Sequence, residues 1–151
     1  MFHPESVNTV RITTILYKDR VEIIHPFFRT GRGNSVVDNG GSGGIINAVD
    51  VETGIIIGSA DEMGIHYETH PESDLPLLGF KMPRWEEAKK LAVELAHVMP
   101  DNHYCGWDLA LTDNGWVLQE ANDRGEFVGF QLPTTKGFRK ELLQILNELG
   151  V

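Results

Sequence analysis

The sequence predicts an α+β fold in which a mostly antiparallel sheet packs against two helices. Three observations predict it: β-rich runs joined by short turns in the first 60 residues, apolar residues at helical spacing from Trp85 to Met99, and a hairpin pattern around Asp113-Asn114-Gly115. The chain has 151 residues, of which 41% are hydrophobic. This length is sufficient for one domain with a real core, so we expect a single domain spanning residues 1–151.

The first half of the chain carries the predicted strands of two hairpins. Four strands are expected, at residues 7–17, 21–28, 45–51 and 54–59. The first two runs are rich in β-branched and aromatic residues and are separated by Lys18-Asp19-Arg20, which is typical of a β-hairpin. Six glycines lie between positions 31 and 44, in the loop between the two hairpins. Residues 60–83 contain three prolines and little periodicity, and are expected to be irregular.

The second half carries both predicted helices, at about 84–98 and 136–149. In the first, Glu86 and Glu87 favour the dipole of the first turn, and Pro100 ends the segment. The second places its apolar residues at spacings of three and four, which is typical of an amphipathic helix. Two further strands are expected between the helices, at residues 103–112 and 116–122.

Charge and composition exclude several classes of function. The net charge of -9 argues against nucleic-acid binding, which needs clustered Lys and Arg. No apolar run reaches the roughly 18–20 residues that a membrane helix needs. The single cysteine, Cys105, cannot form an internal disulfide, so we expect a reducing, cytoplasmic location.

The last hairpin brings acidic side chains together. A three-residue loop at Asp113-Asn114-Gly115, with the glycine in a left-handed conformation, would pair Thr112 with Trp116. That register places Asp108 opposite Glu120 and Asn122 opposite Gly106, all on one face. A two-residue loop would shift the register by one residue and move Asp108 to the other face.

These residues suit a cation. Like charges that face each other across strands are destabilising unless something neutralises them. Asp108, Glu120 and Asn122 offer the hard oxygen ligands that Mg²⁺ prefers. The alternative is an exposed strand face that carries solvated acids, and a single Asp/Glu pair leaves this alternative open.

The same hairpin has the pattern of a known family. Gly106-Trp107-Asp108, the glycine turn and Glu120-Ala121-Asn122 resemble the metal-binding hairpin of the ATP-grasp superfamily, which has a G-x-D strand and a second strand ending in E-x-N. Asn8-Thr9-Val10-Arg11 is similar to the arginine-bearing strand of that family, and Arg29 ends the next strand. The resemblance covers roughly residues 6–131 and looks closest to the branch called sugar-transfer-associated ATP-grasp.

A second motif fits the same family. Asn39 followed by Gly43-Gly44 is similar to the N-x-x-x-G-G loop of its amino-acid ligase branches. The resemblance implies that Asn39, Gly43 and Gly44 contact ATP, as do Arg11 and Arg29, which would also act in catalysis. Arg32, in contrast, is read as an ordinary loop charge.

The resemblance also implies the reaction. Asp108, Glu120 and Asn122 would hold Mg²⁺ or Mn²⁺, and ATP would activate a small carboxylate as an acyl phosphate, which an amine then attacks. Such a carboxylate–amine ligase would belong to cell-surface polysaccharide or peptide biosynthesis. A metal-dependent hydrolase ranks last, because no candidate base or nucleophile lies beside the acidic pair.

The resemblance is to only the second half of the ATP-grasp fold. In that family, two subdomains grip the nucleotide, and we expect the subdomain that precedes the arginine strand to be absent from this chain. We therefore expect a C-terminal ATP-grasp subdomain that is inactive alone and needs a partner N-terminal half. The rival expectation is a non-catalytic nucleotide- or metal-binding or assembly module that retains the hairpin. The exposed sheet edge would also allow a homodimer.

Overall fold

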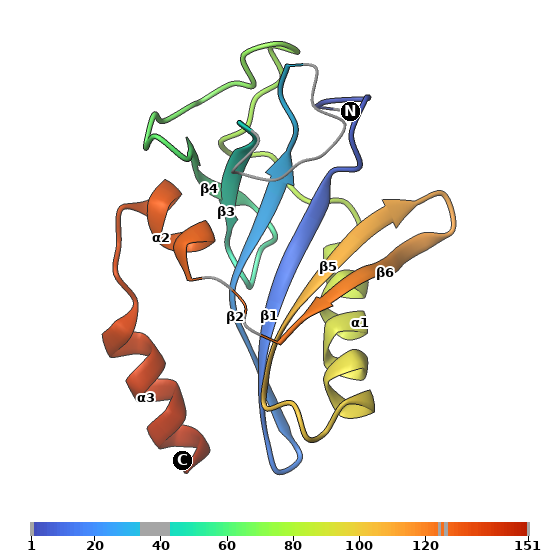
Figure 1. Ribbon diagram of the computed structural model, residues 1–151, viewed down its shortest axis with the longest axis vertical. Coiled ribbons are helices and arrows are strands. Elements are labelled where there is room, and N and C mark those ends of the chain that lie inside the picture. Colours follow the sequence, from blue (N-terminus) through green and yellow to red (C-terminus); the bar gives the residue numbers. More distant parts are fainter. Residues whose placement is uncertain (1, 34–42, 124, 126, 151) are drawn as a thin grey trace.

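The computed structural model confirms the α+β class: in the residues it describes (2–33, 43–123, 125 and 127–150), six antiparallel strands form one sheet and three segments are helical (Figure 1). The strands are β1 (Thr9–Tyr17), β2 (Arg20–Thr30), β3 (Ile45–Val49), β4 (Ile56–Asp61), β5 (Tyr104–Thr112) and β6 (Gly115–Asn122). The helices are α1 (Trp85–Val98), α2 (Val128–Thr134) and α3 (Arg139–Leu149). The spatial order β4-β3-β2-β1-β5-β6 places β1 next to β5.

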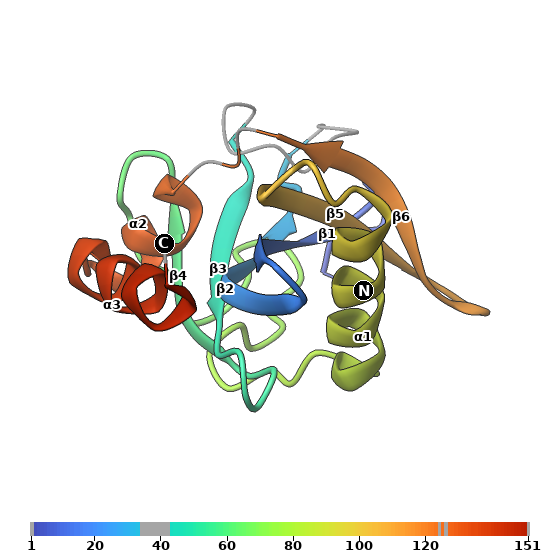
Figure 2. The ribbon, with the colours of Figure 1, turned by 90° about the horizontal axis from the view of Figure 1, so that it is seen from below.

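Each face of the sheet carries its own layer. Side chains alternate along β1, so that Val10 and Ile12 enter the main core with α1, whereas Ile15 lies in a second cluster with Leu149 of α3. Figure 2 shows α1 on one side of the sheet and α2 with α3 on the other. None of the helices in the described part of the chain is long and apolar enough to cross a lipid bilayer.

Helix α1 lies where the sequence predicts it. Its buried residues are Trp85, Ala88, Ala92 and Ala96, at the spacing expected of one helix face. Three small alanines in this row let the helix backbone approach the sheet closely, and the large side chain of Trp107 fills the core beside them. The indole of Trp85 donates a hydrogen bond to the Val51 carbonyl oxygen at 2.8 Å, which ties the start of the helix to the β3–β4 turn.

Helix α2 is an element that the sequence analysis does not predict. It contains Gly129 and Pro133, which as local signals indicate a break in a helix. In the structure, α2 packs closely against the sheet at both of these residues. A Cβ on Gly129 would lie 2.4 Å from the Phe27 ring, and a Cβ on Gly58 of β4 would lie 2.5 Å from the Pro133 carbonyl oxygen.

The segment that follows β4 has no regular element before α1, as expected. It is held by isolated backbone bridges, such as the pair formed by Thr69 and Pro76, and by buried side chains. Leu77 and His70 are fully buried, and the Nε2 atom of His70 lies 3.0 Å from the Gly31 carbonyl oxygen. The irregular segment therefore covers the main core and also fixes the start of the glycine-rich loop.

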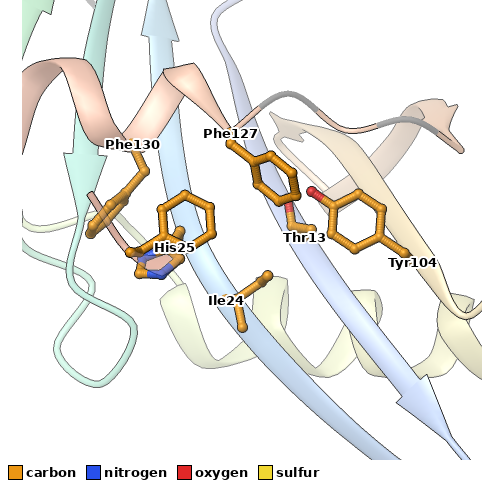
Figure 3. A pocket seen from close by; sticks show the side chains of 7 residues that line it. Thr13, Ile24, His25, Tyr104, Phe127 and Phe130 are labelled. Atoms are coloured by element: carbon orange, nitrogen blue, oxygen red, sulfur yellow. The ribbon is translucent and has the colours of Figure 1, made fainter. Parts of the chain in front are cut away.

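A bulge in β2 anchors the C-terminal helices. Thr13 pairs with Ile24 while Arg11 pairs with Phe27, so two residues of β2, His25 and Pro26, face one residue of β1. His25 has a positive φ of 45°, and its ring lies 4.3 Å from the Phe130 ring and 4.2 Å from the Phe138 ring, measured between centroids. Figure 3 shows His25 near Phe130, among the side chains that line an aromatic pocket. The bulge thus turns a strand residue into the docking point for α2 and α3.

The stability of this docking should depend on pH through His25. Burial lowers the pKa of His25 below its ordinary 6.5, although Glu141, whose Oε2 lies 3.5 Å from Nε2, opposes this. The unfolded chain therefore binds a proton before the folded protein does, and stability falls as the pH drops below about 6.5. His25→Asn, chosen because asparagine tolerates positive φ, should show a shallower fall in urea unfolding between about pH 7 and pH 5.5. Parallel curves for the two proteins would contradict this assignment.

The close approach of α2 to the sheet yields a second prediction. Gly58→Ala should destabilise the fold by about 1–3 kcal/mol, because the new methyl group meets the Pro133 backbone, which cannot rotate away. Gly137→Ala is the matched control, since its Cβ would be 3.6 Å from its nearest neighbour and should change stability by less than about 0.5 kcal/mol. Thermal unfolding of both variants measures the difference, and an unchanged melting temperature for Gly58→Ala would exclude the tight contact.

Candidate functional site

Four neighbouring strands bring five predicted site residues to one face of the sheet, opposite the layer of α1. Arg29 lies on β2, Arg11 on β1, Asp108 on β5, and Glu120 and Asn122 on β6. Arg11 is the direct cross-strand partner of Asp108, which in turn is paired with Glu120. The order of the strands therefore produces a row of five side chains. Two arginines come first, the carboxylate of Asp108 follows, and the last two side chains carry oxygen atoms that could bind a cation.

Asp108 is the buried centre of this row, with a relative exposure of only 1%. Arg11 donates from Nε to Oδ1 at 2.6 Å and from Nη2 to Oδ2 at 2.7 Å, in a two-pronged ion pair. Arg29 donates from Nη2 to the same Oδ2 at 2.7 Å. Two guanidinium groups thus neutralise the charge of Asp108. They offset the electrostatic repulsion between Asp108 and Glu120 that the sequence alone indicates.

The glycine of the G-x-D strand has a direct steric role. Gly106 faces Thr13 on β1, beside the Arg11–Asp108 pair. A Cβ on Gly106 would lie 3.2 Å from Cδ of Arg11, so a larger residue would press on the arginine stem. The guanidinium of Arg11 also lies over the ring of Phe27, 5.7 Å from its centroid. The side chain of Arg11 therefore lies between Gly106, which leaves room for it, and the face of the Phe27 ring.

Thr9 positions Arg29 and was not singled out by the sequence analysis. Its buried hydroxyl accepts hydrogen bonds from Nε of Arg29 at 3.1 Å and from Nη2 at 2.7 Å. Thr9 lies two residues before Arg11, so both point to the same face of β1. Strand alternation around Arg11 is the signal that could have identified it.

The hairpin reaches the predicted pairing by a different route. The expected pair of Thr112 and Trp116 is wrong, because Thr112 pairs with Gly115 and Leu111 with Trp116, across a two-residue turn. The register then shifts between Leu109 and Asp108, and beyond this shift Asp108 faces Glu120 and Gly106 faces Asn122 as predicted. The extra residue is in β6, since Leu118 pairs with Leu109 and Glu120 with Asp108. A bulge thus corrects the register that the short turn sets.

Glu120 and Asn122 are the accessible members of the row. Glu120 is exposed, and the Nδ2 of Asn122 approaches Oδ2 of Asp108 at 3.5 Å. No group of three or more His, Cys, Asp or Glu side chains in the described residues could hold a metal ion; the row offers only two carboxylates and an amide. Its donors are nevertheless hard oxygen ligands that suit Mg²⁺ in kind. Asp108 fits such a site only if it gives up contacts with the arginines.

The glycine-rich loop is seen at its two ends. Asn39 lies outside the described residues, whereas Gly43 has a positive φ of 84° and Gly44 is buried. Arg32 is more than a loop charge: its Nη1 donates to the Tyr67 hydroxyl at 2.7 Å and lies 3.5 Å from Oδ2 of Asp61. Asp61 is 2% exposed, so this network pins the base of the loop to the end of β4.

Two titratable groups near the row, one buried and one half-buried, are suited to packing rather than reaction. Burial raises the pKa of the Cys105 thiol, which confirms the interpretation of Cys105 as a small buried residue. Burial also raises the pKa of Tyr104 to about 12, and its hydroxyl donates to the Gly125 carbonyl oxygen at 3.0 Å. At neutral pH both side chains stay uncharged.

Comparison with known proteins identifies a family for this chain. A family model described as sugar-transfer associated ATP-grasp matches residues 1–147 of the chain. A search of curated proteins found no match. The matched segment contains the complete row from Arg11 to Asn122, so the residues that the geometry brings together all fall within the matched range.

The ion pairs predict a large loss of stability for substitution of one acidic residue of the row and almost none for the other. Asp108→Asn should destabilise the protein by about 3 kcal/mol without any ligand, because it removes a buried carboxylate charge that pairs with two largely buried guanidinium groups. Glu120→Gln should change stability by less than about 0.5 kcal/mol, since its side chain is exposed. Urea unfolding in metal-free buffer measures both. Equal stability of Asp108→Asn and the wild type would show that the ion pairs contribute little.

Proposed function

Because the chain belongs to the sugar-transfer associated ATP-grasp family, we propose that it is the ATP- and Mg²⁺-binding part of a carboxylate–amine ligase. The observation that carries the proposal is the row of Arg29, Arg11, Asp108, Glu120 and Asn122 on one face of the sheet. Arginine side chains that can bind phosphate oxygens lie directly beside side chains whose oxygen atoms can bind a cation. Phosphoryl transfer requires both kinds of contact.

The proposed reaction has two steps. The γ-phosphoryl group of ATP passes to an oxygen of the substrate carboxylate, which gives an acyl phosphate and ADP. The amine then attacks the carbonyl carbon, and the C–O bond to phosphate breaks to release inorganic phosphate and the amide. The transferred group carries much negative charge, so orientation and neutralisation are the main tasks of the protein.

Residues of the row have distinct tasks in this scheme. Glu120 and Asn122 would hold Mg²⁺ or Mn²⁺ together with Asp108, and the bound cation would neutralise phosphate oxygens. Arg11 and Arg29 would orient phosphate or acyl-phosphate oxygens through their planar donor groups. Gly43 and Gly44, with Asn39, would let backbone N–H groups approach the nucleotide.

The wider context of the reaction follows from the family. We propose that an N-terminal ATP-grasp subdomain, on this or another polypeptide, completes the grip on ATP. The family's description as sugar-transfer associated supports a role in cell-surface polysaccharide or peptide biosynthesis. Strand β6 forms one edge of the sheet and gives a surface for self-association, whereas backbone hydrogen bonds from residues 65–67 and 79–80 already occupy the outer edge of β4.

Ligand-induced stabilisation tests the proposed function. Mg²⁺ with a nonhydrolysable ATP analogue, at a hundredfold excess over the dissociation constant, should stabilise the wild type by about 2.7 kcal/mol. Glu120→Gln should lose most of this shift, because it removes a charged ligand, and Asn122→Ala should lose less. Asp113→Asn is the control, since it removes a carboxylate from the exposed turn of the same hairpin.

Differential scanning fluorimetry of the four proteins provides the measurement. Equal shifts in all four would remove Glu120 and Asn122 from the site. Stabilisation of the wild type without ADP formation, in the presence of an N-terminal subdomain and a range of carboxylates and amines, would favour the non-catalytic module.

A further inference from the structure

We propose that Asp108 acts as a shared partner that makes cation and anion binding at this site mutually reinforcing. In the structure its carboxylate is held by Arg11 and Arg29, the same side chains that would receive an anionic ligand. A cation bound by Asp108 would release the arginines for an anion, and an anion bound by the arginines would release Asp108 for a cation. This inference rests on the proposed function, since it concerns how that site is regulated.

The cation side of the coupling follows from the hydrogen bonds of Asp108. A carboxylate has about four acceptor positions. Oδ2 accepts from Nη2 of both arginines at 2.7 Å, and Oδ1 accepts from Nε of Arg11 at 2.6 Å. A divalent cation must therefore compete with three short N–H donors, and two positive guanidinium groups repel it. Arg11 and Arg29 thus lower the affinity of the hairpin for a cation.

The anion side follows from how differently the two arginines are held. Arg11 contacts Asp108 through two donors, with its side chain only 9% exposed. Arg29 contacts Asp108 through one nitrogen and is also held by the Thr9 hydroxyl. An anionic oxygen can therefore replace the Asp108 contact of Arg29 while Thr9 keeps the guanidinium in place. Arg29 is the residue at which partners are exchanged.

The exchange has a thermodynamic consequence. Once Asp108 turns toward a cation beside Glu120, the arginines lose negative charge and gain affinity for an anion. Linkage makes the effect reciprocal, so an anion raises the cation affinity by the same factor. The site would bind a cation and an anion together much better than either alone.

Binding of Mn²⁺ alone, followed by electron paramagnetic resonance, tests the coupling on the full chain. Arg29→Gln should bind Mn²⁺ about tenfold more tightly than the wild type, since Oδ2 of Asp108 then loses one of its two arginine donors. Arg20→Gln is the matched control, because it removes an exposed arginine that pairs with Glu22, and its Mn²⁺ affinity should stay within about twofold of the wild type. In an Asp108→Asn background, Arg29→Gln should change the affinity by less than about twofold.

A second arm needs no variant. Sulfate is the probe anion, and Mn²⁺ should tighten its binding to the wild type about fivefold at constant ionic strength. Equal or weaker Mn²⁺ binding by Arg29→Gln, a gain that persists without Asp108, or sulfate binding that ignores Mn²⁺ would each overturn the proposal. A coupled response without any stabilisation by the ATP analogue would instead reject the nucleotide function and leave the coupling intact.

Discussion

The ion pair of Asp108 with two arginines is the constraint on which the functional face depends. A carboxylate with 1% exposure is costly to bury unless charged donors surround it, and these donors come from two other strands. The registers of β2, β1 and β5 must therefore agree to within one residue. Gly106 and Thr9 belong to the same constraint, because one leaves room for the stem of Arg11 and the other holds Arg29.

The hairpin adds the accessible half of the site through an irregularity. A two-residue turn alone would carry its register along the whole hairpin, and the extra residue of β6 restores the pairing of Asp108 with Glu120. The same device appears in β2, where the extra residue projects the ring of His25 toward α2 and α3. In both strands the bulge sets where a side chain points, and regular strand alternation then extends from it.

The sequence predicts most of the fold and the membership of the row, but not its contacts. Strand runs, the helix after Pro83 and the final helix follow from local periodicity. The sequence places Asp108, Glu120 and Asn122 together through a three-residue loop, whereas the structure reaches the same pairing through a two-residue turn and a bulge. The short helix α2 is missed because Gly129 and Pro133 act there through tertiary packing. The pairing of β1 with β5 joins residues far apart in the sequence, so the neutralisation of Asp108 by Arg11 cannot be read from any local pattern.

The central position of β1 also has a consequence for how the chain folds. Arg11 and Asp108 are 97 residues apart, so their ion pair closes a long loop. The chain must lose the conformational entropy of this loop before the ion pair can form. The β1–β2 hairpin can form early, whereas β5 must dock onto it with the helix-bearing segment already collapsed. We therefore expect the ion pair to be absent from the folding transition state, so that it slows unfolding and has little effect on the folding rate. The residues proposed to bind ligand would then also determine the lifetime of the native state.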